Sequence, residues 1–93
     1  MSEHLGRIVR STAGHDKGMW FCVVGETDAC LLLANGKQRK LAAPKRKKPA
    51  HVEWAGEFSH PVLRQVREGA PVSDRALRRA LAAFKEGNTL GKR

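Results

Sequence analysis

The first strand-like segment of the chain alternates polar and apolar residues with the two-residue period of β-strands. Residues 6–11 show this pattern, and in a pleated strand Ile8 would face opposite to its two neighbours. Residues 19–26 are rich in aromatic and β-branched residues, which favours a second strand. A two-residue turn at 27–28 is then predicted to lead into a third strand over residues 29–35.

The apolar run Leu31-Leu32-Leu33 lacks strict alternation. Such a run fits a strand that is covered on both faces, and a short buried helix is the alternative. The Asn35-Gly36 pair that follows favours a strand ending in a tight turn, because a type I′ turn needs positive φ at both central positions. Short strands over residues 38–41 and 51–54 would bring the count to five, which predicts a small closed barrel.

Residues 42–49 carry Pro44 and Pro49 around the run Lys45-Arg46-Lys47-Lys48. Prolines at these positions exclude the run from a central strand or a helix interior. We therefore expect an exposed and fairly stiff basic loop between the fourth and fifth strands.

The pattern changes after residue 56, which divides the chain into a β-rich segment, residues 1–56, and a helical segment, residues 57–93. Pro61 and Gly69 stand where a short helix commonly begins and ends. The sequence therefore predicts a mainly β fold with a helical appendage of one or two short helices.

The second helix is predicted over residues 75–86, with Ser73 or Asp74 as its N-cap and Gly87 beyond its end. Its apolar residues recur at spacings of three and four and so line one face: Leu77, Ala80, Leu81 and Phe84. We expect this stripe to pack on the barrel or on the first helix, since an isolated helix of this length would be marginal in water. Residues 88–93 are expected to fray into a basic tail.

The charge of the chain indicates the kind of partner that it binds. The 93 residues include 18 Lys and Arg against 9 Asp and Glu, which gives a formal net charge of +9 and a pI near 10.4. Seven of the basic residues fall within residues 37–48, where no acid occurs. A solvated loop is the plain explanation of a single basic run, but the extreme pI favours a polyanionic partner.

Other classes of function find little support in the sequence. The longest apolar run, residues 29–34, is far short of the ~20 residues that span a bilayer, and no signal peptide is evident, so we expect a cytoplasmic protein without a membrane partner. Cys22 and Cys30 belong to no metal-ligand spacing, and buried free thiols are expected rather than a metal site. His15-Asp16 is accompanied by no nucleophile motif or P-loop, so we expect neither catalysis nor a cofactor.

The glycine-punctuated segment between the first two strands resembles a KOW motif. The resemblance covers about residues 5–40 and rests on Gly14, on Lys17-Gly18 and on the flanking apolar alternation. Trp20-Phe21-Cys22 stand where many KOW motifs carry a further glycine. With its basic run and helical tail the chain looks most like small bacterial KOW-domain proteins related to KOW-bearing large-subunit ribosomal proteins. That resemblance implies an SH3-like barrel whose glycine loop approaches RNA, and a role in translation as a ribosomal protein-like, ribosome-associated factor.

The candidate RNA-binding residues combine this loop with the basic run. Lysine and arginine neutralise phosphates, a glycine lets phosphates approach the backbone, and an aromatic ring can stack on an unpaired base. Trp20 follows the loop directly and is the best stacking candidate, although Trp20, Phe21 and Trp54 also suit a barrel core. The full set is Arg10, Gly14, His15, Lys17, Gly18, Trp20, Lys37, Arg39, Lys40, Lys45, Arg46, Lys47 and Lys48.

The sequence therefore predicts a non-catalytic RNA-binding protein, a monomer when free, with ribosomal RNA as the ligand that the resemblance favours and the ribosome or its proteins as further partners. The alternative is an adaptor on the ribosome or the transcription machinery whose C-terminal helices hold a protein. The two differ in the stripe of Leu77, Leu81 and Phe84, which only the adaptor would leave exposed.

Overall fold

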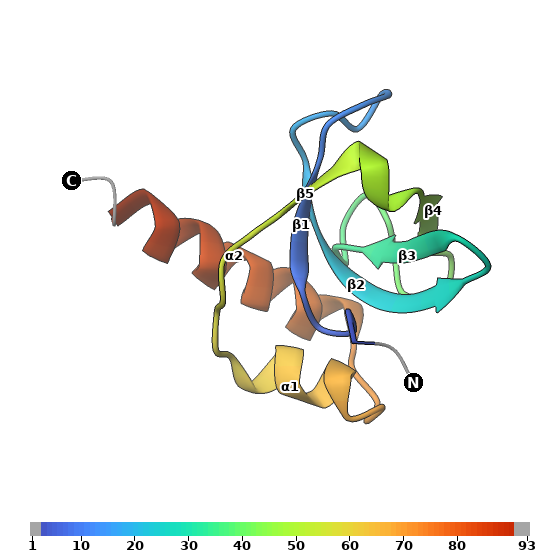
Figure 1. Cartoon of the computed structure of the whole chain (residues 1–93). Helices are drawn as coiled ribbons and strands as arrows, with labels where there is room; N and C mark the ends of the chain where they lie inside the picture. The colour runs from blue at the N-terminus through green and yellow to red at the C-terminus, as the bar shows by residue number, and fades with distance from the viewer. Residues whose placement is uncertain (1–2, 91–93) are drawn as a thin grey trace.

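A computed structural model describes residues 3–90 of the chain, with side chains up to residue 87 (Figure 1). Five strands form one antiparallel sheet in the order β4-β3-β2-β1-β5. The strands are β1 (Ile8–Ser11), β2 (Trp20–Thr27), β3 (Cys30–Ala34), β4 (Lys45–Lys47) and β5 (Val52–Trp54), and a 3₁₀ turn, η1 (Pro49–His51), precedes β5. Two helices follow, α1 (Pro61–Arg67) and α2 (Asp74–Leu90). The mainly β fold with a helical appendage is thus confirmed.

The sheet buries residues on both of its faces. Ile8, Cys22 and Ala34 pack against the two helices, whereas Val9 and Phe21 belong to a second core on the opposite face. The second core also contains Val23, Leu31, Leu33 and Val52. Opposite faces for Ile8 and Val9 were predicted by the alternation, and the two cores explain why the leucine run of β3 is almost continuously apolar.

The predicted closure of the barrel is not confirmed, because the hydrogen-bonded sheet is open with β4 and β5 as its two edges. Both edge strands are only three residues long. Short edge strands, and lysines on β4, limit pairing with other chains in the way that closure was expected to do.

The fourth strand lies later in the chain than predicted. Residues 38–41 are not a strand, because the Asn35 side chain closes a wider loop: its Oδ1 accepts hydrogen bonds from the backbone N–H groups of Lys37 and Arg39, each at 3.0 Å. The N–H of Leu41 then donates to Asp74 Oδ1 at 2.7 Å instead of to a neighbouring strand. A side chain that bonds local backbone in this way competes with sheet pairing.

The basic run supplies the missing strand. Lys45–Lys47 pair with Leu31–Leu33 of β3 as β4, so the prediction of a loop over 42–49 was wrong for these residues. The prolines excluded a central strand, but they allow an edge strand, and β4 is one. The turn between β2 and β3 also lies one residue later than predicted, at Asp28-Ala29, with Asp28 in the left-handed region at φ +50°.

Both helices begin as the sequence indicated. His60 Nδ1 accepts from the N–H of Val62 ahead of Pro61, and Ser73 Oγ accepts from the N–H of Ala76 at 3.0 Å. Gly69, at φ +78°, follows the end of α1. α2 continues through residues 87–90, so it is longer than predicted, and the remaining part of the expected tail, residues 91–93, lies outside the described residues.

The apolar stripe of α2 is buried within the chain. Leu77, Ala80, Leu81 and Phe84 join the core formed by one face of the sheet and by Leu63 and Val66 of α1. Packing is also close at the helix start, where Gly36 lies against the backbone of α2. The helices therefore cover one face of the sheet, while the loop between β1 and β2 projects at the end of the sheet away from α1 (Figure 1).

Candidate nucleic-acid interface

The loop between β1 and β2 is a tight hairpin closed by backbone hydrogen bonds. The N–H of Ser11 donates to Met19 O at 2.9 Å, and the N–H of Gly18 donates to Ser11 O at 2.7 Å. Gly14 and Gly18 have φ values of +86° and +89°, a region that residues with a Cβ rarely enter. Both positions therefore favour glycine, which lets the chain reverse without strain.

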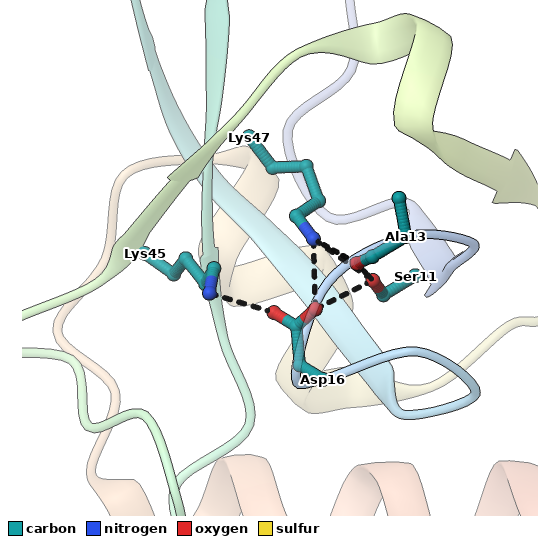
Figure 2. Close-up of polar contacts among 5 residues, drawn as sticks. All are labelled: Ser11, Ala13, Asp16, Lys45 and Lys47. Atoms are coloured by element: carbon teal, nitrogen blue, oxygen red, sulfur yellow. Dashed lines mark hydrogen bonds and ion pairs between the residues drawn. The ribbon is translucent and has the colours of Figure 1, made fainter.

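Lys47 of β4 reaches into this loop and holds it (Figure 2). Its Nζ donates to Asp16 Oδ1 at 2.7 Å, to Ala13 O at 2.8 Å and to Ser11 Oγ at 2.9 Å. An ammonium group has three N–H donors, so these three acceptors satisfy it completely. Lys47 is 8% exposed. It therefore organises the loop and has no donor left for a phosphate.

Asp16 is the acceptor at the centre of this network. Its Oδ1 also lies 2.7 Å from the Ser11 hydroxyl, which has one proton to share between Asp16 and the Ala13 carbonyl oxygen at 3.0 Å. Lys45 Nζ lies 3.1 Å from Oδ2, an ion-pair distance, although its approach angle does not make a hydrogen bond. The loop is thus fixed to β4 by one carboxylate between two lysines, as Figure 2 shows.

The pKa of Asp16 reflects these contacts. Burial alone would raise it, but hydrogen bonds from Lys47 and Ser11, together with the Lys45 ammonium, outweigh burial and hold the pKa far below its usual value. Asp16 is therefore ionised throughout the physiological range, and the network contains a permanent ion pair.

The strand geometry of β4 divides the basic run into two groups. Because successive side chains of a strand point to opposite faces, Lys45 and Lys47 point toward Asp16 and Arg46 points away. The Arg46 side chain is 61% exposed and lies 3.7 Å from Asp28, itself exposed. Lys48 is exposed at the start of η1, a turn whose His51 carbonyl oxygen accepts from the N–H of Thr12 beside the loop.

The structure brings the basic run and the glycine loop together. An added Cβ on Gly14 would lie 3.6 Å from Lys47 Nζ, so the two segments meet on one side of the sheet. The outward-facing residues of the loop are Gly14, His15, Lys17 and Gly18, all exposed. These residues and Lys48, which is exposed one position beyond β4, make up what we call the loop face, a set with two exposed lysines and two exposed glycines.

Arg10 lies at the edge of this face and is partly engaged. Its guanidinium donates from Nε and Nη2 to Glu53 Oε1 on β5, and it lies 5.7 Å from the centre of the Trp20 ring. Trp20 is half-buried, with its ring centre 5.1 Å from that of Phe84 in an edge-on arrangement. Trp20 is thus part of the packing of α2 and still reaches the surface.

The remaining aromatic candidates separate clearly. Phe21 is fully buried in the second core, whereas Trp54 is 37% exposed. The centre of the Trp54 ring lies 4.8 Å from that of His4 and 5.3 Å from the Arg7 guanidinium carbon. The remaining predicted cations, Lys37, Arg39 and Lys40, are exposed on the loop that follows Asn35. This loop lies beside α2, where Arg78 donates to Gly36 O at 3.3 Å.

The organising residues Ser11 and Asp16 were missed as parts of the site. The sequence analysis considered Asp16 only as a partner of His15, but the side chain faces Lys47 while His15 is exposed. The available signal was a single acid within a basic segment, five residues after Ser11. Its pairing with Lys47 across 31 positions depends on where β4 lies, which the sequence analysis placed wrongly.

Within residues 3–90, no three His, Cys, Asp or Glu side chains are grouped so as to hold a metal ion, and no helix is long and apolar enough to cross a membrane. Cys22 and Cys30 are free thiols, and burial raises the pKa of Cys22 to about 12.

Comparison with known proteins finds no matching family model and no significantly similar curated protein.

Proposed function

We propose that this chain is a non-catalytic, cytoplasmic RNA-binding protein that contacts RNA phosphates through the loop face. Ribosomal RNA is the ligand that the resemblance to KOW-domain proteins favours. The carrying observation is that β4 fixes the glycine loop through Lys47 and Asp16, while Lys17, Lys48 and the loop backbone remain open.

The charges support a backbone contact rather than a sequence-reading one. Lys17 and Lys48 are exposed, and an exposed lysine binds a phosphate as a point charge. Gly14 and Gly18 are exposed and carry no side chain, so a phosphate can approach the loop closely at these positions. Phosphate contacts position a nucleic acid without specifying its sequence.

An adaptor function that uses the C-terminal helices gains no support. The surface it requires is the stripe of Leu77, Leu81 and Phe84, and these residues are buried against the sheet and α1. The RNA-binding proposal needs no rearrangement of this packing.

Removal of the two exposed lysines of the loop face tests the proposal. Lys17→Ala with Lys48→Ala should weaken binding to single-stranded and to duplex RNA, because both present phosphates. For single strands, the slope of log affinity against log salt should fall by about 1.4, or about 0.7 for each lost contact. Fluorescence anisotropy with labelled RNA at several salt concentrations measures both quantities.

The matched control is Arg64→Ala with Arg75→Ala, which removes two exposed charges from the helices. It should leave the salt slope unchanged within error. Equal effects of the two double variants, or a wild-type protein that binds neither RNA at low salt, would contradict the proposal.

A further inference from the structure

A groove lies between α2 and the loop that follows β3, next to Trp20. Its volume is about 320 Å³. Trp20, Leu81 and Ala82 supply apolar walls, and its polar lining comes from Asn35, Lys37, Gln38, Arg78, Lys85 and Glu86. Small-molecule sites combine apolar walls with polar groups that fix the orientation of the ligand, and here polar residues form most of the lining. We call this feature the Trp20 groove.

The charge of the Trp20 groove is positive on balance. Lys37, Arg78 and Lys85 stand against the single carboxylate of Glu86. The ion pairs among the described side chains involve none of these three cations. Among the described residues, the Arg78 guanidinium makes one hydrogen bond, to the Gly36 carbonyl oxygen, which leaves most of its donors open. The groove therefore combines an aromatic ring with unneutralised cations.

The Trp20 ring is held in place before any ligand arrives. Phe84 meets it edge-on from α2, and Arg10, paired with Glu53, lies over it from β1. A ring fixed in this way loses little conformational freedom when a base packs on it. Along the chain, only Met19 separates Gly18 of the loop face from Trp20.

We propose that the Trp20 groove accepts an unpaired nucleotide of single-stranded RNA, with its base against Trp20 and Ala82 and its neighbouring phosphates at Lys37, Arg78 and Lys85. This inference rests on the RNA-binding function proposed above and adds a preference to it. The loop face binds phosphates of any RNA, whereas a base inside a duplex cannot enter the groove. α2, which the sequence analysis left out of the site, thereby becomes part of the interface.

The test compares two RNA probes and two double variants. The probes are an oligouridine of about 12 nucleotides, within the usual range of single-strand sites, and a duplex RNA of the same length. Lys37→Ala with Lys85→Ala should weaken oligouridine binding about fivefold or more and lower its salt slope by about 1.4. Duplex binding should change no more than in the control Arg64→Ala with Arg75→Ala.

Tryptophan fluorescence gives a second test, which requires no substitution within the Trp20 groove. In a Trp54→Phe background the only tryptophan is Trp20. Oligouridine should quench its emission, whereas the duplex and an oligoglutamate of the same length should not. Quenching by oligoglutamate as strong as by oligouridine would overturn the inference in favour of an acidic protein partner.

The outcomes separate the groove from the loop face. If Lys37→Ala with Lys85→Ala behaves like the control on both probes, or if Trp20 emission does not respond to oligouridine, the groove inference fails. The RNA-binding proposal would still stand in that case, provided that Lys17→Ala with Lys48→Ala weakens both probes. A wild-type protein that binds neither probe would overturn both.

Discussion

The Asp16 carboxylate stabilises a lysine that would otherwise be buried without a counter-charge. Lys47 and Asp16 are both buried, and Lys47 donates to no other charged group. Desolvation makes such a pair a weak source of net stability, but removal of one partner leaves an uncompensated charge in the interior. Removal of the Asp16 carboxylate alone should therefore cost measurable stability, although the intact ion pair adds little.

Asp16→Asn should lower the free energy of unfolding by about 3 kcal/mol, at the low end of the cost of breaking a buried ion pair. Asp28→Asn is the matched control, because Asp28 is exposed and lies 3.7 Å from an exposed Arg46, so the change should stay within about 0.5 kcal/mol. Urea unfolding followed by circular dichroism measures both. Similar losses in the two variants would contradict a central role for Asp16.

Acid should act on the same carboxylate. The pKa of Asp16 is lowered in the folded chain, so its contribution to stability is fully present above the unfolded value of about 3.9 and is lost as pH falls toward the folded value. Between about pH 5 and about pH 2.5, the wild-type protein should lose more stability than Asp16→Asn. Urea midpoints across this range supply the comparison, and parallel curves would exclude the linkage.

Among the elements, the loop after β3 meets α2 through a glycine. An added Cβ on Gly36 would lie 2.2 Å from the carbonyl oxygen of Asp74, and the residue has φ +78°. A side chain at position 36 would collide with the backbone of α2 unless the loop and the helix moved apart. Gly18 has a similar φ of +89° but no neighbouring atom within 4 Å.

Gly36→Ala should therefore destabilise the protein clearly more than Gly18→Ala. Gly18→Ala carries only the cost of a left-handed residue, about 1 to 2 kcal/mol. Gly36→Ala adds the displacement of the loop from α2, and thermal unfolding should show its larger shift. Equal shifts in the two variants would mean that the contact between Gly36 and α2 contributes little.

The elements that could be predicted from the sequence were those whose signal is local. Alternation predicted β1, aromatic and β-branched residues predicted β2, and Pro61, Gly69 and Ser73 marked the helix boundaries. The fourth strand was misplaced because the Asn35 side chain closes a loop around residues 37–39, which no periodicity records.

Within the candidate site, too, only the features with a local sequence signal could be predicted. Glycines and exposed cations of the loop face are visible in the sequence, since they need only a turn and a surface. Lys47 was predicted to meet a ligand, but it is satisfied by Ser11, Ala13 and Asp16 once β4 pairs with β3. Long-range pairing of this kind decides which lysines of a basic run stay free.

For the whole molecule, the sheet makes the two halves of the sequence depend on each other. One core lies between the sheet and the helices, and the other lies on the opposite face of the same strands. Ile8, Cys22 and Ala34 would be exposed to water if residues 57–93 were absent. We therefore predict that the β-rich and helical segments unfold as one cooperative unit rather than as two independent domains.

Two single-tryptophan variants test this cooperativity. In Trp54→Phe the remaining Trp20 reports on the contact between β2 and α2, and in Trp20→Phe the remaining Trp54 reports on β5, at the far edge of the sheet. Within each variant, the urea midpoint from fluorescence should coincide with the midpoint from circular dichroism. The reason is that the same strands contribute to both cores, so loss of one core should disrupt the other. If the Trp20 signal instead changes at lower urea than the circular dichroism of the same variant, α2 leaves the sheet first. The Trp20 groove would then exist only while that helix is docked, and RNA binding at the loop face would outlast binding in the groove.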